Sequence, residues 1–331
     1  MSILVLTHTD VENLLPMDEC IEVMAGAMAA LARGQVFQPL RMLVRPPEAR
    51  GLMVVMPAYM AGGDGRAFYG LKAIGVFPGN PALGKDAHQG AVLLYSGQTG
   101  ELLAVMNASA ITAIRTAAVS GLATRWLARA DAHDCAIIGA GVQARTHLAA
   151  MRAVRRLRRV RVTGRSLAHA QKLADECFVR GAPFTIEPVA TVEEAVRGAD
   201  LIVTATTATE PVLKREWIAP GAHLNVVGAY TPTTREVDSA TMAAARLFVD
   251  RRESALNEAG DVLLAIQDGA IGPEHILAEL GEVVIGSRPG RTAPDEITVF
   301  KSLGLPVEDL AAAEHLYRRA LETGIGSDVE F

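Results

Sequence analysis

The feature that most constrains the fold is the hexapeptide GAGVQA at 139–144, which directly follows an apolar segment at 135–138 and opens a helix predicted to run through Val154. In this arrangement the first glycine permits a tight turn, the second lets the backbone approach a pyrophosphate, and the small last residue allows close packing of helix on strand. Free N–H groups at the helix start hold the anion. The pattern predicts a Rossmann-type dinucleotide site formed by Gly139, Ala140, Gly141, Val142, Gln143 and Ala144. Glycines that only form turns are the alternative, but the flanking strand and helix favour the site.

From Asp134 onward apolar strands alternate with helices, which is typical of a parallel sheet with helical crossovers. We predict strands at 135–139, 159–164, 184–189, 200–206, 223–229 and 246–250. An acidic helical stretch, a loop at 288–295 and a closing helix from Val307 to Thr323 follow. The loop is either a lid or an ordinary surface loop. The predicted fold class is therefore α/β, with a doubly wound Rossmann-type sheet.

The chain before Asp134 has a different texture. Residues 9–33 are predicted to form one amphipathic helix, capped by Thr9 or Asp10 and ended by Gly34. Between 36 and 106, short apolar runs separated by Pro, Gly and Asp predict strands joined by turns.

A helix rich in alanine is predicted at 107–130, with Asn107 as its N-cap. We therefore expect the Rossmann domain, residues 121–305, to be inserted in a second, α+β domain that is formed by residues 1–120 and 306–331.

Composition argues against several classes of protein. The chain has 32 basic and 37 acidic residues, a formal net charge of −5, which argues against a dedicated nucleic-acid-binding protein. No apolar run approaches the ~20 residues needed to cross a bilayer, and the start lacks the basic flank and long apolar stretch of a signal peptide. Cys20, Cys135 and Cys177 form neither a CxxC pattern nor a zinc-ligand spacing. We expect a cytoplasmic enzyme without a metal site, acting on neither nucleic acid nor membrane.

The end of the second predicted strand of the Rossmann domain indicates which dinucleotide is bound. An enzyme that selects NAD usually has Asp or Glu there to bind the ribose 2′-hydroxyl. This chain instead has Arg165 and Ser166, which suit a 2′-phosphate. NADP(H) is therefore favoured and NAD(H) remains open; a solvated Arg165 in the first turn of a helix is the alternative.

A run of arginines lies between Arg152 and Arg161. It has the charge of a nucleic-acid-binding patch, but no aromatic residues interleave with it and the whole chain is acidic. Cations near a helix C-terminus also complement the helix dipole. We interpret the run as a solvated face.

Five segments of the chain form an ordered set: GLKAIGVFPGNPALG, ASAITAIRTAAVSGLA, IIGAGVQA with the glycine turn, VGAYTPTTREVD and DEITVFKSLGLPVEDLAAA. They follow one another in the order found in the ornithine cyclodeaminase/μ-crystallin family, which the chain resembles over nearly its whole length. The RTAA and TVFKSLG motifs are much more specific than a glycine pattern. Members of this family are NAD(P)-dependent and act on amino acids or cyclic imino acids. The resemblance implies a homodimer whose first domain binds substrate and dimerises.

The resemblance also implies that Arg41, Lys72 and Arg115 bind the substrate carboxylate, with Lys72 and Arg115 catalytic. An α-imino carboxylate needs such a clamp, because a fork-shaped guanidinium fixes it in two directions. Lys72 lies in a glycine-flanked apolar strand, where a bare ammonium is costly unless an anion pairs with it. Lys72, or water held near it, is our candidate proton donor. Surface ion pairs are the alternative for each cation, and Arg45 is an alternative to Arg41.

Further positions match family contacts with cofactor or substrate. Leu303 is expected near substrate, and the predicted cofactor contacts outside the hexapeptide and Arg165–Ser166 are His88, Arg115, Thr116, Thr204, Val227, Gly228 and Ser302. A structural histidine, threonines that merely suit strand ends, and a helix cap at Ser302 are the alternatives.

Tyr230 is the most informative departure from the family. Cyclodeaminases and the family's alanine dehydrogenase have an aspartate at this position, which can accept protons during deamination. A tyrosine hydroxyl, with an unperturbed pKa near ~10, cannot replace it as a base at neutral pH. Neither Glu236 nor Asp238 is expected at the site. Reduction of a preformed C=N bond, which needs no deaminating base, fits better.

We therefore expect an NAD(P)H-dependent reductase of cyclic α-imino acids, with Δ1-pyrroline-2-carboxylate as the leading substrate and L-proline as product. One alternative is an ornithine cyclodeaminase, or a dehydrogenase acting on alanine, lysine or iminosuccinate. Another, from a different class, is a non-catalytic NADP-dependent ligand-binding protein.

Overall fold

The computed structural model describes residues 2–61, 65–179 and 184–331, without the side chains of residues 177–179. Cys177 therefore lies outside the described side chains. The chain forms two compact units: unit 1 comprises residues 1–115 and 304–331, and unit 2 comprises residues 116–303. The boundaries fall at 115/116 and 303/304, where the sequence predicted 120/121 and 305/306.

Unit 1 is built on a mixed sheet with the strand order β16-β1-β7-β6-β5-β4-β2, and β3 pairs with β4. Its strands are β1 (Ser2–Leu6), β2 (Val36–Phe37), β3 (Met42–Val44), β4 (Leu52–Ala61), β5 (Ala67–Val76), β6 (His88–Ser96), β7 (Leu102–Asn107) and β16 (Ser327–Glu330). Strands β4 to β7 are antiparallel neighbours, and β1 pairs parallel with β7 and antiparallel with β16. Strands β6 and β7 are consecutive and form an antiparallel hairpin.

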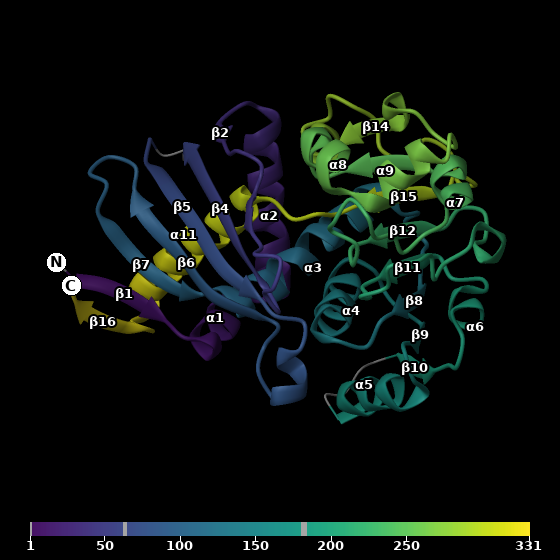
Figure 1. The fold of residues 1–331 in the computed structure, drawn as a ribbon, viewed down its shortest axis with the longest axis horizontal. Coiled ribbons are helices and arrows are strands. Elements are labelled where there is room, and N and C mark those ends of the chain that lie inside the picture. The colour runs from purple at the N-terminus through teal and green to yellow at the C-terminus, as the bar shows by residue number, and fades with distance from the viewer. Residues whose placement is uncertain (1, 62–64, 180–183) are drawn as a thin grey trace. The chain divides into compact units, whose positions relative to one another are not determined.

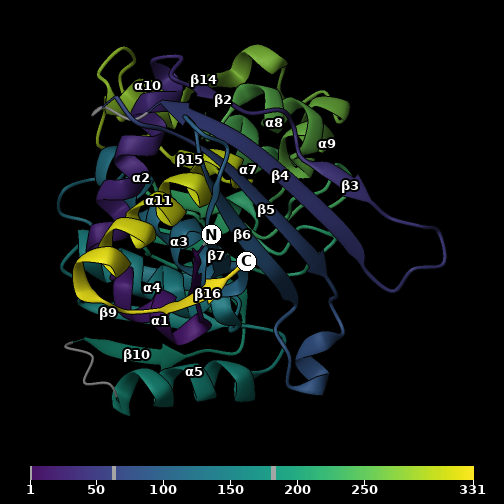
Figure 2. The same ribbon diagram turned by 90° about the vertical axis from the view of Figure 1, so that its left-hand side faces the viewer.

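Alternate residues of β4, β5 and β6 point to opposite faces of this sheet, because side chains along a strand alternate. One face is buried beneath α11 (Pro306–Thr323), which also packs on α2 (Met17–Ala32), as Figures 1 and 2 show. Gly70 of β5 makes this packing close, since a Cβ there would lie 2.9 Å from a methyl carbon of Leu310. Lys72 is on the same buried face, between Met56 of β4 and Val92 of β6.

The single helix predicted at 9–33 is wrong, because the segment forms two helices, α1 (His8–Leu14) and α2. Pro16 separates them, since proline has no N–H to donate and restricts the residue before it. The expected cap at Thr9 or Asp10 is also wrong: Thr7 caps α1, and the Asp10 carboxylate returns a hydrogen bond to the Thr7 backbone N–H at 2.9 Å. Strand β1 was not predicted.

Unit 2 contains an all-parallel sheet with the order β10-β9-β8-β11-β12-β15-β13-β14, the doubly wound arrangement of a Rossmann-type fold (Figure 1). Its strands are β8 (Asp134–Ile138), β9 (Arg159–Thr163), β10 (Thr185–Pro188), β11 (Leu201–Thr204), β12 (His223–Val226), β13 (Arg246–Val249), β14 (Ile276–Glu279) and β15 (Thr298–Lys301). The predicted α/β class is confirmed. Strands β14 and β15 were not predicted, and β14 lies in the acidic stretch that was expected to be helical.

The remaining helices are α3 (Ala108–Leu127), α4 (Val142–Val154), α5 (Leu167–Val179), α6 (Val192–Val196), α7 (Ser239–Ala244), α8 (Arg252–Glu258), α9 (Gly260–Gln267) and α10 (Leu280–Val284), with 3-10 turns η1 (Asn80–Leu83), η2 (Arg215–Trp217) and η3 (Pro273–His275). The unit boundary falls within α3. Asn107 caps α3 as predicted, accepting a hydrogen bond from the Ala110 N–H at 3.0 Å. In the described part of the chain, no helix combines the length and apolar character needed to span a bilayer.

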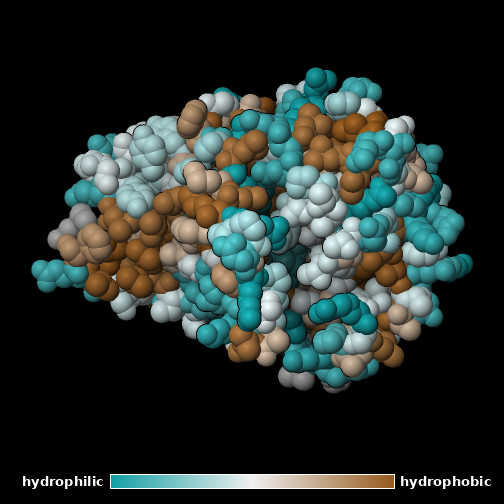
Figure 3. Space-filling view, in the orientation of Figure 1, coloured by the Kyte–Doolittle hydropathy of each residue, from teal (hydrophilic) through white to brown (hydrophobic). Residues whose placement is uncertain are grey.

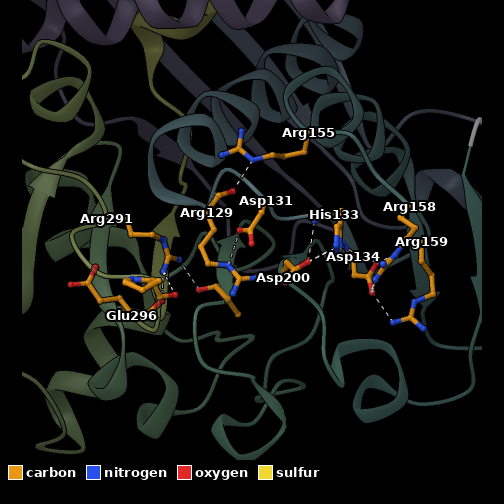
Figure 4. Close-up of polar contacts among 12 residues, drawn as sticks. Arg129, Asp131, His133, Asp134, Arg155, Arg158, Arg159, Asp200, Arg291 and Glu296 are labelled. Carbon is orange, nitrogen blue, oxygen red and sulfur yellow. Dashed lines mark hydrogen bonds and ion pairs between the residues drawn. The ribbon is translucent and has the colours of Figure 1, made fainter.

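Arginines of the run between Arg152 and Arg161 form ion pairs and hydrogen bonds near the amino ends of the unit 2 strands (Figure 4). Arg158 and Arg159 pair with Asp134, the first residue of β8, at 3.1 and 2.8 Å. Arg155 donates to carbonyls at the end of α3, including that of Thr124 at 2.8 Å. The run therefore joins strands and a helix end within unit 2, rather than forming a bare basic patch.

The loop at 288–295 lies at the same amino ends. Arg291 donates to the carbonyl of Leu127 at 2.8 Å and to the hydroxyl of Thr298 at 3.0 Å. The nucleotide-binding edge of such a sheet is at the opposite, carboxyl ends of the strands. The lid interpretation of this loop is therefore wrong, because the loop is anchored away from that edge.

Candidate functional site

Four buried charged residues form a cluster in unit 1. Lys72 comes from β5, Arg115 from α3, and Glu308 and Asp309 from the first turn of α11, whose N-terminal dipole favours acidic residues. The Lys72 ammonium lies 2.6 Å from Asp309 Oδ2. Arg115 donates from Nε to Asp309 Oδ1 at 3.0 Å and from Nη1 to Glu308 Oε2 at 2.6 Å. Buried ions need such partners, because each loses its hydration.

The cluster sets the protonation of its cations. Burial lowers the pKa of Lys72 to about 8, reinforced by the Arg115 charge and opposed by Asp309. For Arg115, burial alone would lower the pKa, but Asp309 and Glu308 together outweigh it and raise the pKa above its usual range. Burial, with the charges of Lys72 and Arg115, lowers the pKa of His88 to about 4, so this imidazole is neutral at pH 7.

Arg41 lies beside these residues, half-buried, and donates from Nη2 to the Gly304 carbonyl at 2.9 Å. Its charge contributes to the lowered pKa of Lys72. Unit 1 therefore brings together four of the residues predicted from the sequence: Arg41, Lys72, His88 and Arg115. A concentration of cations around a neutral imidazole is suited to binding a small carboxylate.

No role for Glu308 and Asp309 was predicted from the sequence. The signal was present, since two adjacent acids stand within the otherwise apolar segment LGLPVEDLAAA. Acids inside an apolar helix face are costly to bury unless cations meet them. The sequence did not show that Lys72 and Arg115 are those cations.

The glycine turn of unit 2 has the geometry that a pyrophosphate requires. Gly139 has φ +123°, and a Cβ there would lie 2.4 Å from the Ala205 carbonyl oxygen, so only glycine fits. Gly141 is the N-cap of α4, has no side chain to cap the helix, and a Cβ built on it meets no atom within 4 Å. Ala144 is fully buried. The start of α4 is therefore exposed and unobstructed at Gly141, which fits a dinucleotide phosphate.

Arg165 and Ser166 follow the carboxyl end of β9 and are exposed. The Ser166 hydroxyl is 2.7 Å from Nδ1 of His169, in the first turn of α5. Both residues are therefore accessible at the position where a 2′-phosphate is expected.

Glu236, for which no role was predicted, is fully buried. Its carboxylate accepts hydrogen bonds from the Thr204 hydroxyl at 2.8 Å, the Thr206 N–H at 2.7 Å and the Gly228 N–H at 2.6 Å. Gly228 cannot have a side chain, because a Cβ would lie 2.2 Å from the Thr206 carbonyl oxygen. Glu236 therefore joins the segments that follow β11 and β12, at the edge where this fold binds ligands.

A buried ion pair lies next to Glu236 and hydrogen-bonds to its backbone. Lys301, at the end of β15, lies 3.0 Å from Asp261 Oδ2 and donates to the Ala229 carbonyl at 2.5 Å. Asp261 Oδ1 accepts from the Glu236 N–H at 2.7 Å. Burial raises the pKa of Glu236, although the Lys301 charge opposes this.

The other positions predicted to contact the cofactor or substrate in unit 2 are Thr116, Thr204, Val227, Ser302 and Leu303. Thr204 has an internal partner in Glu236, and the Leu303 N–H donates to Asp250 at 2.6 Å. The Ser302 hydroxyl is buried and has no hydrogen-bond partner among the described residues. This fits a hydroxyl that hydrogen-bonds to a ligand. Thr116 is buried, and Val227 follows β12. These roles remain predictions.

Tyr230 follows β12 and is 41% exposed. Glu236, which was not expected to act at the substrate site, lies beneath the Gly228 turn with its carboxylate bound to backbone donors. Among the described residues, no group of three or more His, Cys, Asp or Glu could hold a metal ion.

A Rossmann-type parallel sheet with a glycine turn at the start of α4 defines a pyridine-nucleotide-dependent oxidoreductase. The model of the ornithine cyclodeaminase/mu-crystallin family matches residues 1–324, and the chain belongs to this family.

Three relatives illustrate the range of the family. The chain is 43% identical to the rat (Rattus norvegicus) ketimine reductase mu-crystallin, over 90% of both chains. It superposes on the Thermococcus litoralis Δ1-pyrroline-2-carboxylate reductase in complex with NADH and L-proline with a TM-score of 0.94, at 39% identity over 99% of this chain and 100% of the other. It superposes on an archaeal alanine dehydrogenase dimer with bound NAD with a TM-score of 0.92, at 35% identity over the whole of both chains.

Proposed function

We propose that the chain is an NAD(P)H-dependent reductase of cyclic α-imino acids, with Δ1-pyrroline-2-carboxylate as substrate and L-proline as product. The observation that carries the proposal is the buried pair of cations Lys72 and Arg115, with Arg41 beside them. Three cations face the two carboxylates of Glu308 and Asp309, so the group keeps one net positive charge for a substrate carboxylate. The T. litoralis reductase supports the choice of substrate.

In the proposed reaction the bound nicotinamide supplies a hydride to the C=N carbon. Arg41, Lys72 and Arg115 bind and orient the imino acid through its carboxylate, which fixes the face that the C=N carbon presents. Lys72 is the candidate proton donor to the imine nitrogen, directly or through water, because a pKa of about 8 lets it lose a proton near neutral pH.

Tyr230 supports reduction over deamination. It stands where the family's deaminating enzymes have an aspartate, so the carboxylate that accepts a proton in those enzymes is missing. Reduction of a preformed imine requires a proton donor and no such base.

We propose NADP(H) as the preferred cofactor, because Arg165 and Ser166 are exposed after β9 and no acidic residue occupies the segment 163–166. Arg165→Ala is expected to weaken NADPH binding by about tenfold and to leave NADH binding unchanged, since it removes a guanidinium that pairs only with the 2′-phosphate. Arg156→Ala, in the arginine run, is the control. Equal loss for both nucleotides contradicts the assignment.

We propose a homodimer that forms through the open face of the unit 1 sheet. Hydrophobic surface gathers over this sheet in Figure 3, and Met53 and Tyr69 on it are 46% and 52% exposed. Leu71 and Leu93, a cross-strand pair of the same face, are half-exposed. An apolar sheet face of this kind needs a cover, and the alanine dehydrogenase is a dimer.

We retain the cytoplasm as the proposed location. Cys20 and Cys135 are buried free thiols, which agrees with a reducing compartment.

The proposal is tested by NADPH oxidation with Δ1-pyrroline-2-carboxylate, measured beside NADH and beside ornithine with NAD. We expect turnover with the imine, faster with NADPH, and no ammonia from ornithine. Ammonia release without imine reduction would identify a cyclodeaminase. Tight NADPH binding without turnover on any imine would identify a ligand-binding protein.

A further inference from the structure

The carboxylate of Asp309 contacts two cations, one with each oxygen. Oδ2 lies 2.6 Å from the Lys72 ammonium, and Oδ1 accepts from Arg115 Nε at 3.0 Å. The side chains of Lys72 and Asp309 are each 1% exposed. One carboxylate therefore fixes the relative position of two groups that come from β5 and α3.

The neighbouring acid has a different relation to the cluster. Glu308 accepts from Arg115 Nη1 at 2.6 Å, whereas the opposing charge that bears on Lys72 is that of Asp309. Asp309 therefore contacts both Lys72 and Arg115, whereas Glu308 contacts Arg115. These adjacent residues of one helix turn provide a matched pair for substitution.

The titratable and charged groups around Lys72 come from every element packed there. They are Arg41 before β3, His88 of β6, Arg115 of α3, Glu308 and Asp309 of α11, and Cys20 of α2, which faces Arg115 and Glu308. His88 is neutral at pH 7 and burial raises the pKa of the Cys20 thiol, so neither supplies a positive or negative charge. Asp309 is therefore the carboxylate that opposes deprotonation of Lys72.

We infer that Asp309 is a positioning residue, which holds Lys72 as an ammonium and fixes the plane of Arg115 for an incoming substrate carboxylate, while Glu308 acts on Arg115. The inference deepens the proposed function and rests on it for the identity of that carboxylate. Asp309 itself touches neither substrate nor cofactor in this role.

The experiment compares Asp309→Asn and Glu308→Gln with the wild type in two measurements. The first is the pH titration of the Lys72 13Cε resonance in protein labelled at lysine, assigned with Lys72→Arg. The second is the pH profile of kcat/KM with Δ1-pyrroline-2-carboxylate and NADPH. Loss of an adjacent opposite charge lowers a lysine pKa by about one unit or more. In Asp309→Asn we expect the midpoint of the Lys72 resonance titration to fall by that amount, together with the pKa above which kcat/KM decreases (the alkaline limb of the profile). In Glu308→Gln we expect both values to be unchanged.

A residue needed only for folding would lower thermal stability and leave the Lys72 midpoint unchanged, and an unchanged midpoint in Asp309→Asn overturns the inference. The resonance titration needs no turnover, so a wild type inactive on every imine refutes the proposed function without deciding the role of Asp309. If Asp309→Asn does not fold, Lys72→Met is added to it. Recovery of folding in the double variant supports the pairing, since it removes the unpaired ammonium. Failure to recover shows that the lost contact with Arg115 Nε, rather than the unpaired ammonium of Lys72, decides folding, and contradicts the role of Asp309 at Lys72.

Discussion

Gly304 lies so close to the guanidinium of Arg115 that a Cβ on this glycine would be 2.3 Å from Nη1. Its φ of +79° also belongs to the left-handed region. We expect Gly304→Ala to push Arg115 out of its contacts with Asp309 and Glu308 and to lower kcat/KM for the imino acid at least about tenfold, because a displaced guanidinium no longer meets the substrate carboxylate. Steady-state kinetics measure this.

Gly100→Ala is the control for backbone strain. Gly100 has a φ of +75°, and a Cβ there meets no atom within 4 Å. Both substitutions therefore introduce a strained residue, at a cost of about 1 kcal/mol, but only one lies against the cation cluster. Equal kinetic losses in the two variants would show that strain, not Arg115, is responsible.

The lowered pKa of Lys72 predicts a pH-dependent activity. Below a pH of about 8 Lys72 is an ammonium that binds carboxylate and can donate a proton; above it the amine does neither. We expect kcat/KM to fall about tenfold per pH unit above this value and the limb to be absent from the residual activity of Lys72→Met. Lys85→Met, on an exposed turn, is expected to keep the limb. A limb that survives in Lys72→Met belongs to another group.

The lowered pKa of Lys72 also predicts how the free energy of unfolding changes with pH. The folded pKa of Lys72 lies below the unfolded value of about 10.4, so between these values the unfolded chain binds more protons. The contribution of Lys72 to stability therefore rises with pH across this window. Urea titrations of the wild type and Lys72→Met at pH 7.5 and pH 10 are expected to show the difference, with the wild type gaining relative to the variant at the higher pH.

How much of this structure the sequence predicts depends on how far apart in the chain the interacting residues lie. The glycine turn at 139–144 and the alternating strands are local patterns, and the structure has them where expected. Strand β15 is four residues long, and only its pairing between β12 and β13 makes it a strand. The partners of Lys72 and Glu236 lie far away in sequence, at Asp309 and Gly228 among others, so no local pattern could name them.

Glu236→Gln tests whether the buried carboxylate organises the nucleotide edge. An amide nitrogen cannot accept from the N–H groups and hydroxyl that Glu236 now binds, so at least one donor among Thr204, Thr206 and Gly228 loses its acceptor. We expect about tenfold weaker NADPH binding by calorimetry, together with lower thermal stability. Glu210→Gln, at an exposed position, is the control. Unchanged affinity despite a lowered Tm would limit Glu236 to a folding role.

Asp134→Asn tests the amino-end network of unit 2. Burial alone would raise the pKa of Asp134, but its hydrogen bond with Arg158 and the charges of Arg159, Arg158 and His133 outweigh it and lower the pKa below the usual value. A carboxylate with a lowered folded pKa stabilises the protein above its unfolded pKa, and this is lost as the pH falls through the folded value. We expect the variant to lose about 1 kcal/mol at pH 7, since exposed arginines contribute little more.

Urea titrations at pH 7 and pH 3 measure this difference, which is expected to shrink at the lower pH. Asp131→Asn is the control, because Asp131 pairs with Arg129 at 3.4 Å with a side chain that is 82% exposed. A difference between Asp134→Asn and wild type that stays constant with pH would show that the amide disturbs packing rather than charge.

Leu71→Glu tests the proposed dimer face. Leu71 pairs across the strands with Leu93 on the open face of the unit 1 sheet, so a carboxylate there would be buried without a partner if a second copy covered it. We expect the variant to elute as a monomer in size-exclusion chromatography with light scattering, where the wild type elutes as a dimer. Leu321→Glu is the matched control, because Leu321 is 65% exposed on α11, which packs against the other face of the sheet. A Leu71→Glu protein that remains dimeric while Leu321→Glu dissociates would place the interface on α11 instead.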